Sequence, residues 1–97
     1  MPTYISLMNW TDQGVREVKN SPQRLDAAKA AAKKLGGEFK FFYMTFGEYD
    51  MVAICDFPDD ATAARFVLTA GMAGASRGVT LKAFTEPEYR DVMKSLG

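Results

Sequence analysis

The chain has 97 residues, twelve basic and twelve acidic side chains, no histidine, one cysteine and a formal net charge of zero. A neutral chain lacks the excess of Lys and Arg that attracts nucleic-acid phosphates, and a chain without histidine lacks the commonest metal ligand and the usual general acid or base near neutral pH. We therefore expect no nucleic-acid partner, no metal or other cofactor, and no histidine-dependent catalysis.

The length and the apolar content are those of one soluble domain spanning residues 1–97. Hydrophobic residues make up 47% and charged residues 25% of the chain, which is ordinary for a globular protein and enough for one core without disulfides. The longest uncharged apolar stretch, Met51 to Cys55, is far too short to cross a membrane as a helix. A lone cysteine and the absence of a leader-like start favour a cytoplasmic location.

The first third of the chain predicts a strand, a short helical turn and a long helix. Thr3–Trp10 is rich in aromatic and branched residues, and Thr11 can cap a short turn after it. Ser21 precedes a proline, which is a typical helix start, and Gly36–Gly37 ends the helix predicted over Pro22–Leu35. The residues expected to face inward recur at helical spacing: Leu25, Ala28, Ala32 and Leu35.

Two further strands are predicted to form a hairpin. Phe39–Phe46 and Met51–Phe57 are both rich in aromatic and aliphatic residues, and the segment Gly47–Asp50 joins them. A four-residue connection with a glycine is a hairpin signal, because glycine adopts the positive φ that such loops require. We expect Gly47 to supply this conformation.

The remainder of the chain predicts a helix, a strand and a terminal helix. Asp59 and Asp60 can cap a helix that runs to about Ala73, and Val79–Phe84 alternates as a strand. A capping box over Thr85–Glu88 starts the last helix. The apolar residues expected to face inward on the first of these helices are Ala64, Val67, Leu68 and Met72, and those that form one stripe on the second are Tyr89, Val92, Met93 and Leu96.

The order βαββαβ with a terminal helix predicts an α+β, ferredoxin-like fold. Four antiparallel strands then carry the helices on one face, with the first and third strands in the centre of the sheet. The second and fourth strands lie at the edges, where Lys40 and Lys82 help to prevent pairing with other chains.

Both faces of this sheet are expected to be apolar. Strict alternation divides the second strand into Phe39, Phe41, Tyr43 and Thr45 on one face and Lys40, Phe42, Met44 and Phe46 on the other. The third strand divides into Met51, Ala53, Cys55 and Phe57 against Val52, Ile54 and Asp56. Only one face meets the helices, so the other must be covered by the terminal helix or by a second subunit. We favour a twofold homodimer whose two sheets face each other.

The chain resembles the GYD domain family over nearly its whole length. The motif that gives the family its name stands here as Gly47, Tyr49 and Asp50. Further similar segments are Tyr4–Leu7, Thr11–Val15, Ser21–Leu25, Leu35–Gly37 and Val79–Phe84. The resemblance implies membership of the dimeric α/β-barrel superfamily and a homodimer or higher homo-oligomer, and it transfers no established activity. The hairpin motif is also distantly similar to the effector-binding domain of Lrp/AsnC-type regulators, which bind small molecules between subunits.

Six side chains are candidates for binding a ligand: Tyr4, Ser6, Trp10, Tyr43, Tyr49 and Asp50. These side chains could have purely structural roles, packing in the core, in a turn or at a dimer interface. Their functional interpretation is an apolar cavity between sheet and helices with a few convergent polar atoms, which is the usual composition of a small-molecule site.

Three other features have a structural and a functional interpretation. Arg24 and Arg77 could each clamp a carboxylate or a phosphate, or could be ordinary surface arginines. Cys55 lies among apolar neighbours, where a thiol is normally inert. Asp59 and Asp60 are expected to cap a helix and not to bind a metal.

The function favoured by these features is a non-catalytic domain for small-molecule binding or assembly, working as a homodimer with a small apolar or amphipathic ligand. The alternative is a small cofactor-independent enzyme similar to the monooxygenases and isomerases of the same superfamily. In that case Tyr49 or Asp50 would handle a proton, and Trp10 or Tyr43 would shape the pocket.

Overall fold

The computed structural model describes residues 1–97 and contains every strand and helix that the sequence predicts. The strands are β1 (Thr3–Trp10), β2 (Glu38–Met44), β3 (Met51–Asp56) and β4 (Ser76–Ala83). The helices are α1 (Asp12–Arg16), the short 3-10 helix η1 (Val18–Asn20), α2 (Ser21–Lys34), α3 (Asp60–Met72) and α4 (Glu86–Ser95). β2 ends two residues earlier than expected, at Met44, and β4 begins three residues earlier, at Ser76.

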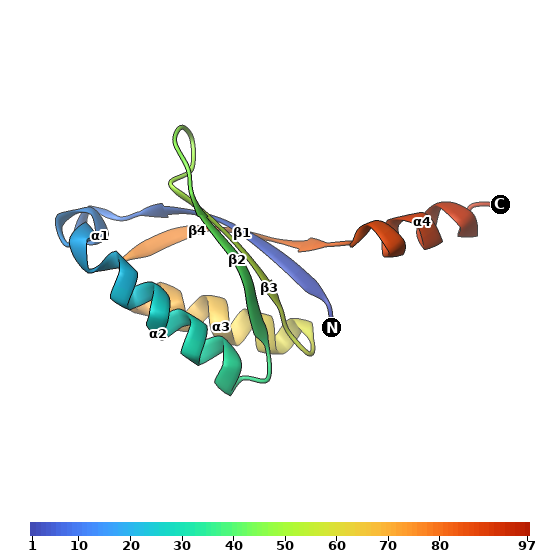
Figure 1. The fold of residues 1–97 in the computed structure, drawn as a ribbon, viewed down its shortest axis with the longest axis horizontal. Coiled ribbons are helices and arrows are strands. Elements are labelled where there is room, and N and C mark those ends of the chain that lie inside the picture. The colour runs from blue at the N-terminus through green and yellow to red at the C-terminus, as the bar shows by residue number, and fades with distance from the viewer.

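The four strands form one antiparallel sheet in the order β2-β3-β1-β4, which confirms the ferredoxin-like arrangement. The central strands are β3 and β1, as predicted. Figure 1 shows α2 and α3 side by side on one face of the sheet, while the loop between β2 and β3 projects away from these helices. We call the face covered by α2 and α3 the inner face and the opposite one the outer face.

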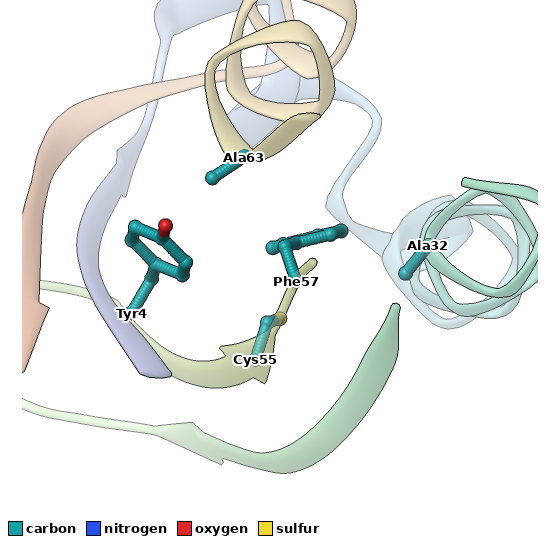
Figure 2. Close-up of a cluster of buried hydrophobic side chains, with 5 residues drawn as sticks. All are labelled: Tyr4, Ala32, Cys55, Phe57 and Ala63. Carbon is teal, nitrogen blue, oxygen red and sulfur yellow. The ribbon is translucent and has the colours of Figure 1, made fainter. Parts of the chain in front are cut away.

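The compact part of the core lies at the end of the sheet where β1 begins and β3 ends. Figure 2 shows Phe57 between the two helices, with Tyr4 and Cys55 on the sheet side. The Phe57 ring centroid lies 6.0 Å from that of Tyr4 and 5.0 Å from that of Phe66 on α3. Gly37 passes so close that an added Cβ would lie 2.5 Å from the Phe57 ring. This contact explains why a glycine stands between α2 and β2.

The inward side of α3 differs from the prediction. The buried residues of the helix are Thr62 and Ala63, and Phe66 packs against the core beside them. Leu68 is 63% exposed and Met72 85% exposed, so the expected stripe of Ala64, Val67, Leu68 and Met72 does not form the buried side of the helix. Its first three residues instead line an open groove beside Thr80 and Lys82 of β4. The contact of Phe66 with Phe57 determines which side of α3 faces the core, and the local sequence does not reveal this contact.

A β-bulge also overturns the strict alternation predicted for β2. The register pairs Phe39 with Cys55 and Phe41 with Ile54, so that Lys40 is an extra residue on this edge strand. The extra residue moves Phe41 and Tyr43 to the opposite face from Phe39. Phe39 and Phe42 therefore lie on the inner face, and Phe41 and Tyr43 on the outer face.

The outer face carries two complete cross-strand rows of apolar side chains. In strand order these rows are Phe41, Ile54, Ile5 and Leu81, and Tyr43, Val52, Leu7 and Val79. Polar residues border them at both ends, with Glu38, Asp56 and Thr3 on one side and Asn9 on the other. Arg77, opposite Asn9 in the register, turns its guanidinium to Gly71 of α3. Asp56 accepts a hydrogen bond from Thr3 and pairs with Lys40 at 3.4 Å. The face thus has an apolar centre and a polar rim, and the prediction of an apolar second face is confirmed.

The terminal helix α4 leaves this face open. Its capping box forms as predicted, with Thr85 and Glu88 each accepting a backbone N–H of the other. Figure 1 shows that α4 extends beyond the end of β4, away from the sheet. The four residues of its apolar stripe are 42 to 75% exposed: Tyr89, Val92, Met93 and Leu96. The alternative in which α4 covers the second face was therefore wrong. None of the helices is long and apolar enough to span a membrane.

Candidate functional site

A cavity of about 350 Å³ separates the inner face of the sheet from α2 and α3. Twenty residues line it, and fifteen of them are hydrophobic. Alanines of both helices make up much of its roof: Ala27, Ala28 and Ala31 on α2, and Ala70 and Ala73 on or next to α3. Because an alanine side chain is a single methyl group, these helices rest near the sheet without filling the space beneath them. The cavity exists because two helices present small residues at helical spacing.

The two ends of this cavity differ in polarity. At the end near the core, Phe39 and Cys55 on the sheet and Ala31 on α2 line it. At the other end, where β1 finishes and α2 begins, the lining contains most of its polar atoms. They come from four residues: Trp10, Ser21, Arg24 and Ser76. An amphipathic molecule would therefore be held in one orientation.

The connections around the polar end explain how these residues come together. Thr11 caps α1 by accepting the Gly14 N–H at 3.1 Å, and its own N–H donates to the carbonyl of Ala75 at 3.1 Å. Gly14 packs against Ala75 so closely that an added Cβ would lie 2.0 Å from that carbonyl oxygen. Trp10 and Ser76 face each other across the β1–β4 ladder. α1 is thus fixed to the start of β4, which brings the beginning of α2 to the cavity mouth.

Arg24 is the one charged side chain in the cavity lining. It is half-buried, and its guanidinium donates to the carbonyls of Glu17 at 3.3 Å and Gly14 at 3.4 Å. None of the three ion pairs of the chain includes it. Both acceptors are uncharged backbone carbonyls, so these hydrogen bonds orient the guanidinium without supplying a counter-ion.

Burial raises the pKa of the Cys55 thiol to about 11, and the nearby Asp56 carboxylate adds to the effect. Cys55 is therefore protonated at neutral pH and is a poor nucleophile in the cavity wall. Burial likewise raises the pKa of Tyr4 to about 12, with further contributions from its hydrogen bond to Asp60 and from the charges of Asp60 and Asp59. Both groups are neutral under ordinary conditions.

The motif residues Gly47 and Asp50 shape the hairpin and join it to the end of β1. The Asp50 carboxylate accepts the N–H of Trp10 at 3.0 Å, and the Asp50 N–H donates to the Asn9 side chain at 3.0 Å and the Met8 carbonyl at 2.9 Å. Gly47 has φ of 121°, as the predicted turn requires. Asp50 therefore ties the hairpin to the end of β1. Asp59 plays a similar part at α3, where it caps the helix by accepting the Thr62 N–H at 2.8 Å.

The structure places the six candidate ligand residues in four locations. Ser6 and Trp10 line the cavity, while Tyr4 lies in the core and donates its hydroxyl hydrogen to Asp60. Tyr43 lies on the outer face, and Tyr49 and Asp50 lie in or beside the hairpin loop. Sequence reasoning placed Ala28 on the inward side of α2 but did not find the other alanines of the cavity roof. Their spacing on α2 was the available signal, but alanine is equally common on packed and exposed helix faces.

Comparison with known proteins agrees with this architecture. The family model described as "GYD domain" matches residues 4–93. The chain belongs to the GYD domain family. A relative from Thermus thermophilus named "Glutamine synthetase and cystathionine beta-lyase binding protein" is 31% identical over 84 residues, which cover 86% of this chain and 88% of the relative. This GYD protein therefore has a curated relative whose name describes binding and not catalysis.

Two solved structures show the same fold. The crystal structure of TTHA0845 from Thermus thermophilus superposes with a TM-score of 0.54 at 24% identity, covering 88% of this chain and 95% of that one. The leucine response regulatory protein LrpA of Mycobacterium tuberculosis superposes with a TM-score of 0.50 at 14% identity, covering 88% of this chain and 53% of that one. These likenesses support the ferredoxin-like fold of the GYD protein.

Proposed function

We propose that this GYD protein is a non-catalytic binding protein that works as a homodimer and holds a small apolar or amphipathic molecule in its inner cavity. The observation that carries the proposal is that the sheet has two apolar faces. The inner face borders the cavity, and the outer face is open in a single chain. The fold thus has one surface for a ligand and another for assembly.

The layout of the outer face supports a second copy of the chain as its occupant. An interface between subunits usually has an apolar centre and a polar rim, as this face has. Its rim carries both signs of charge at one end, where Glu38 and Asp56 lie beside Lys40. A surface with both signs can be complementary to itself about a twofold axis.

The size of this face indicates which other elements a dimer must use. With strands ~4.8 Å apart and every second residue ~6.8 Å along a strand, the two apolar rows cover about 260 Å² in projection. A standard interface buries about 800 Å² per partner. The remainder must come from the polar rim, the projecting hairpin and α4. The exposed apolar stripe of α4 (Tyr89, Val92, Met93 and Leu96) fits such a role.

The composition of the cavity supports binding without chemistry. Its lining contains no carboxylate, phenol or lysine, and the Cys55 thiol is protonated at neutral pH. General acid–base catalysis needs a group that changes protonation near the working pH. The proposed enzymatic roles of Tyr49 and Asp50 would have to be exercised outside this cavity. The volume, about 350 Å³, lies at the lower end of the range for small-molecule sites.

Thermal denaturation with a metabolite library tests the binding function. A molecule that binds only the folded state raises the melting temperature, and at a hundred times its Kd it adds about 2.7 kcal/mol. The matched control is Ala28→Phe, which fills the cavity from α2 with a residue that a helix tolerates. Compounds that shift the GYD protein but not the filled variant support the proposal. If every shift persists in Ala28→Phe, or no compound shifts either protein, the cavity is not a binding site.

A protein partner is a second candidate, favoured by the name of the Thermus relative. In a dimer joined through the outer faces, α3 stays on the outside with Val67, Leu68 and Met72 exposed. The direct test is biolayer interferometry with the glutamine synthetase and the cystathionine β-lyase of the organism from which this chain comes. Binding that Leu68→Glu weakens tenfold or more, while Ala28→Phe leaves it intact, would support this candidate. Absence of binding to either enzyme would exclude these two partners.

A further inference from the structure

The charge of Arg24 has no counter-ion in a cavity whose lining is otherwise neutral. The ion pairs of the chain join Lys40 to Asp56, Lys82 to Asp60 and Arg90 to Glu86. Arg24 instead donates to two carbonyls on the α1 side. A guanidinium has five N–H groups, so donors remain for a molecule inside the cavity.

A carboxylate satisfies this site better than a neutral group. The planar guanidinium matches the two oxygens of a carboxylate, and charge-assisted hydrogen bonds are shorter and stronger than neutral ones. The hydroxyls of Ser21 and Ser76 line the same end of the cavity and can donate to the same anion. One positive charge with two neutral donors suits a single negative charge, whereas a phosphate dianion would leave one charge uncompensated.

The opposite end of the cavity selects the rest of the molecule. Phe39 and Ala31 offer no hydrogen-bond partner to a polar group placed there, and the Cys55 thiol is only a weak one. Burying an unpaired hydroxyl or amide costs about 1–3 kcal/mol. An apolar body avoids this cost, and the volume limits that body to roughly one ring or a short branched chain.

We propose that the ligand is a small carboxylic acid with an apolar body, with its carboxylate on Arg24 and its body between the sheet and the alanines of α2 and α3. This inference rests on the proposed cavity function and names the chemical class of the ligand. Arg24 acts as the residue that selects an anionic head group. Its two carbonyl contacts hold the guanidinium in place before the ligand arrives.

Two probes with the same body test the inference: 3-phenylpropionate and 3-phenylpropan-1-ol, compared by isothermal titration calorimetry. We expect the GYD protein to bind the acid roughly tenfold to a hundredfold more tightly than the alcohol, as for a charge-assisted hydrogen bond. Arg24→Gln should abolish this preference, and Arg24→Lys should retain part of it. Arg16→Gln removes an exposed arginine of α1 and should leave the preference unchanged. The ratio of two affinities in one protein is insensitive to a general loss of stability.

The outcomes separate the inference from the function on which it rests. Equal affinities for the two probes, or a preference that survives Arg24→Gln, overturn the role of Arg24. If Ala28→Phe still blocks both probes in that case, the cavity remains a binding site of another specificity. If neither probe binds at up to about ten millimolar, the ligand class is wrong, and the cavity function is then judged by the metabolite library alone.

Discussion

Replacing Ile54 by lysine should separate the proposed dimer while leaving the chain folded. Ile54 lies on the central strand β3, and its cross-strand neighbours on the outer face are Ile5 and Phe41. In a single chain this face is open, so the lysine stem can cover its neighbours while the ammonium stays in water. We expect the variant monomer to lose about 1 kcal/mol of folding stability, because Ile54 is only partly buried.

The effect on a dimer is much larger because symmetry doubles it. Two sheets packed through their outer faces would bring both lysines into the apolar centre, without a counter-ion and near the twofold axis. Each buried unpaired ion costs several kcal/mol, so the pair should weaken association by at least about 4 kcal/mol, or roughly a thousandfold in Kd. Repulsion between the two ammonium groups adds to this effect.

Sedimentation velocity over a concentration series measures this change directly. Met72→Lys is the matched control, because it adds the same charge at a position on α3 that is 85% exposed and lies on the helical side. Ile54→Lys should sediment as one chain at concentrations where the native protein and Met72→Lys sediment as two. If Ile54→Lys associates as tightly as the native chain, the subunits meet through another surface.

Three further predictions concern the core. Gly37→Ala should cost about 2 kcal/mol in urea unfolding, because its Cβ would lie 2.5 Å from the Phe57 ring; a loss below about 0.5 kcal/mol would mean that the contact relaxes freely. Folding raises the Tyr4 pKa from 10.0 to about 12, so the unfolded chain loses this proton at a lower pH than the folded one. The free energy of unfolding should therefore decrease as the pH rises through that interval, and Tyr4→Phe should make this decrease smaller. Cys55 should react with a thiol reagent at pH 8 at least a hundredfold more slowly in the folded than in the unfolded chain, and equal rates would contradict its burial.

Much of the fold could be predicted because local and long-range signals agree along most of the chain. The run Thr3–Trp10 has strand-forming residues throughout, and the helix α2 has a proline near its start and Gly36 after its end. Thr85 and Glu88 lie at capping-box spacing and form that box. At these positions the backbone conformation follows from residues within one turn.

The errors fall where packing chooses between equal local alternatives. On α3, Val67 and Leu68 are as apolar as Phe66, and only the contact of Phe66 with Phe57 decides which side faces inward. On β2, one extra residue at Lys40 reverses the faces that follow it, although the strand remains continuous. No local pattern marks either choice.

The candidate site was predictable in part for the same reason. Ser6 and Trp10 share the inner face of β1 through simple alternation, so both reach the cavity lining as the strand pattern implies. Arg24 was ambiguous from sequence, because its place depends on how α1 is fixed to Ala75 at the start of β4. Tyr43 was assigned to the same face as Phe39, and the bulge separates them.

The mass of the native protein in solution tests the central claim most directly. Multi-angle light scattering at tens of micromolar should give twice the chain mass of 10.7 kDa. The reason is that the apolar outer face of each sheet is removed from water only when a second subunit covers it. A mass of more than two chains would be consistent with the same interface in a larger assembly, provided that Ile54→Lys lowers the measured mass. A mass of one chain across the concentration series would contradict the account.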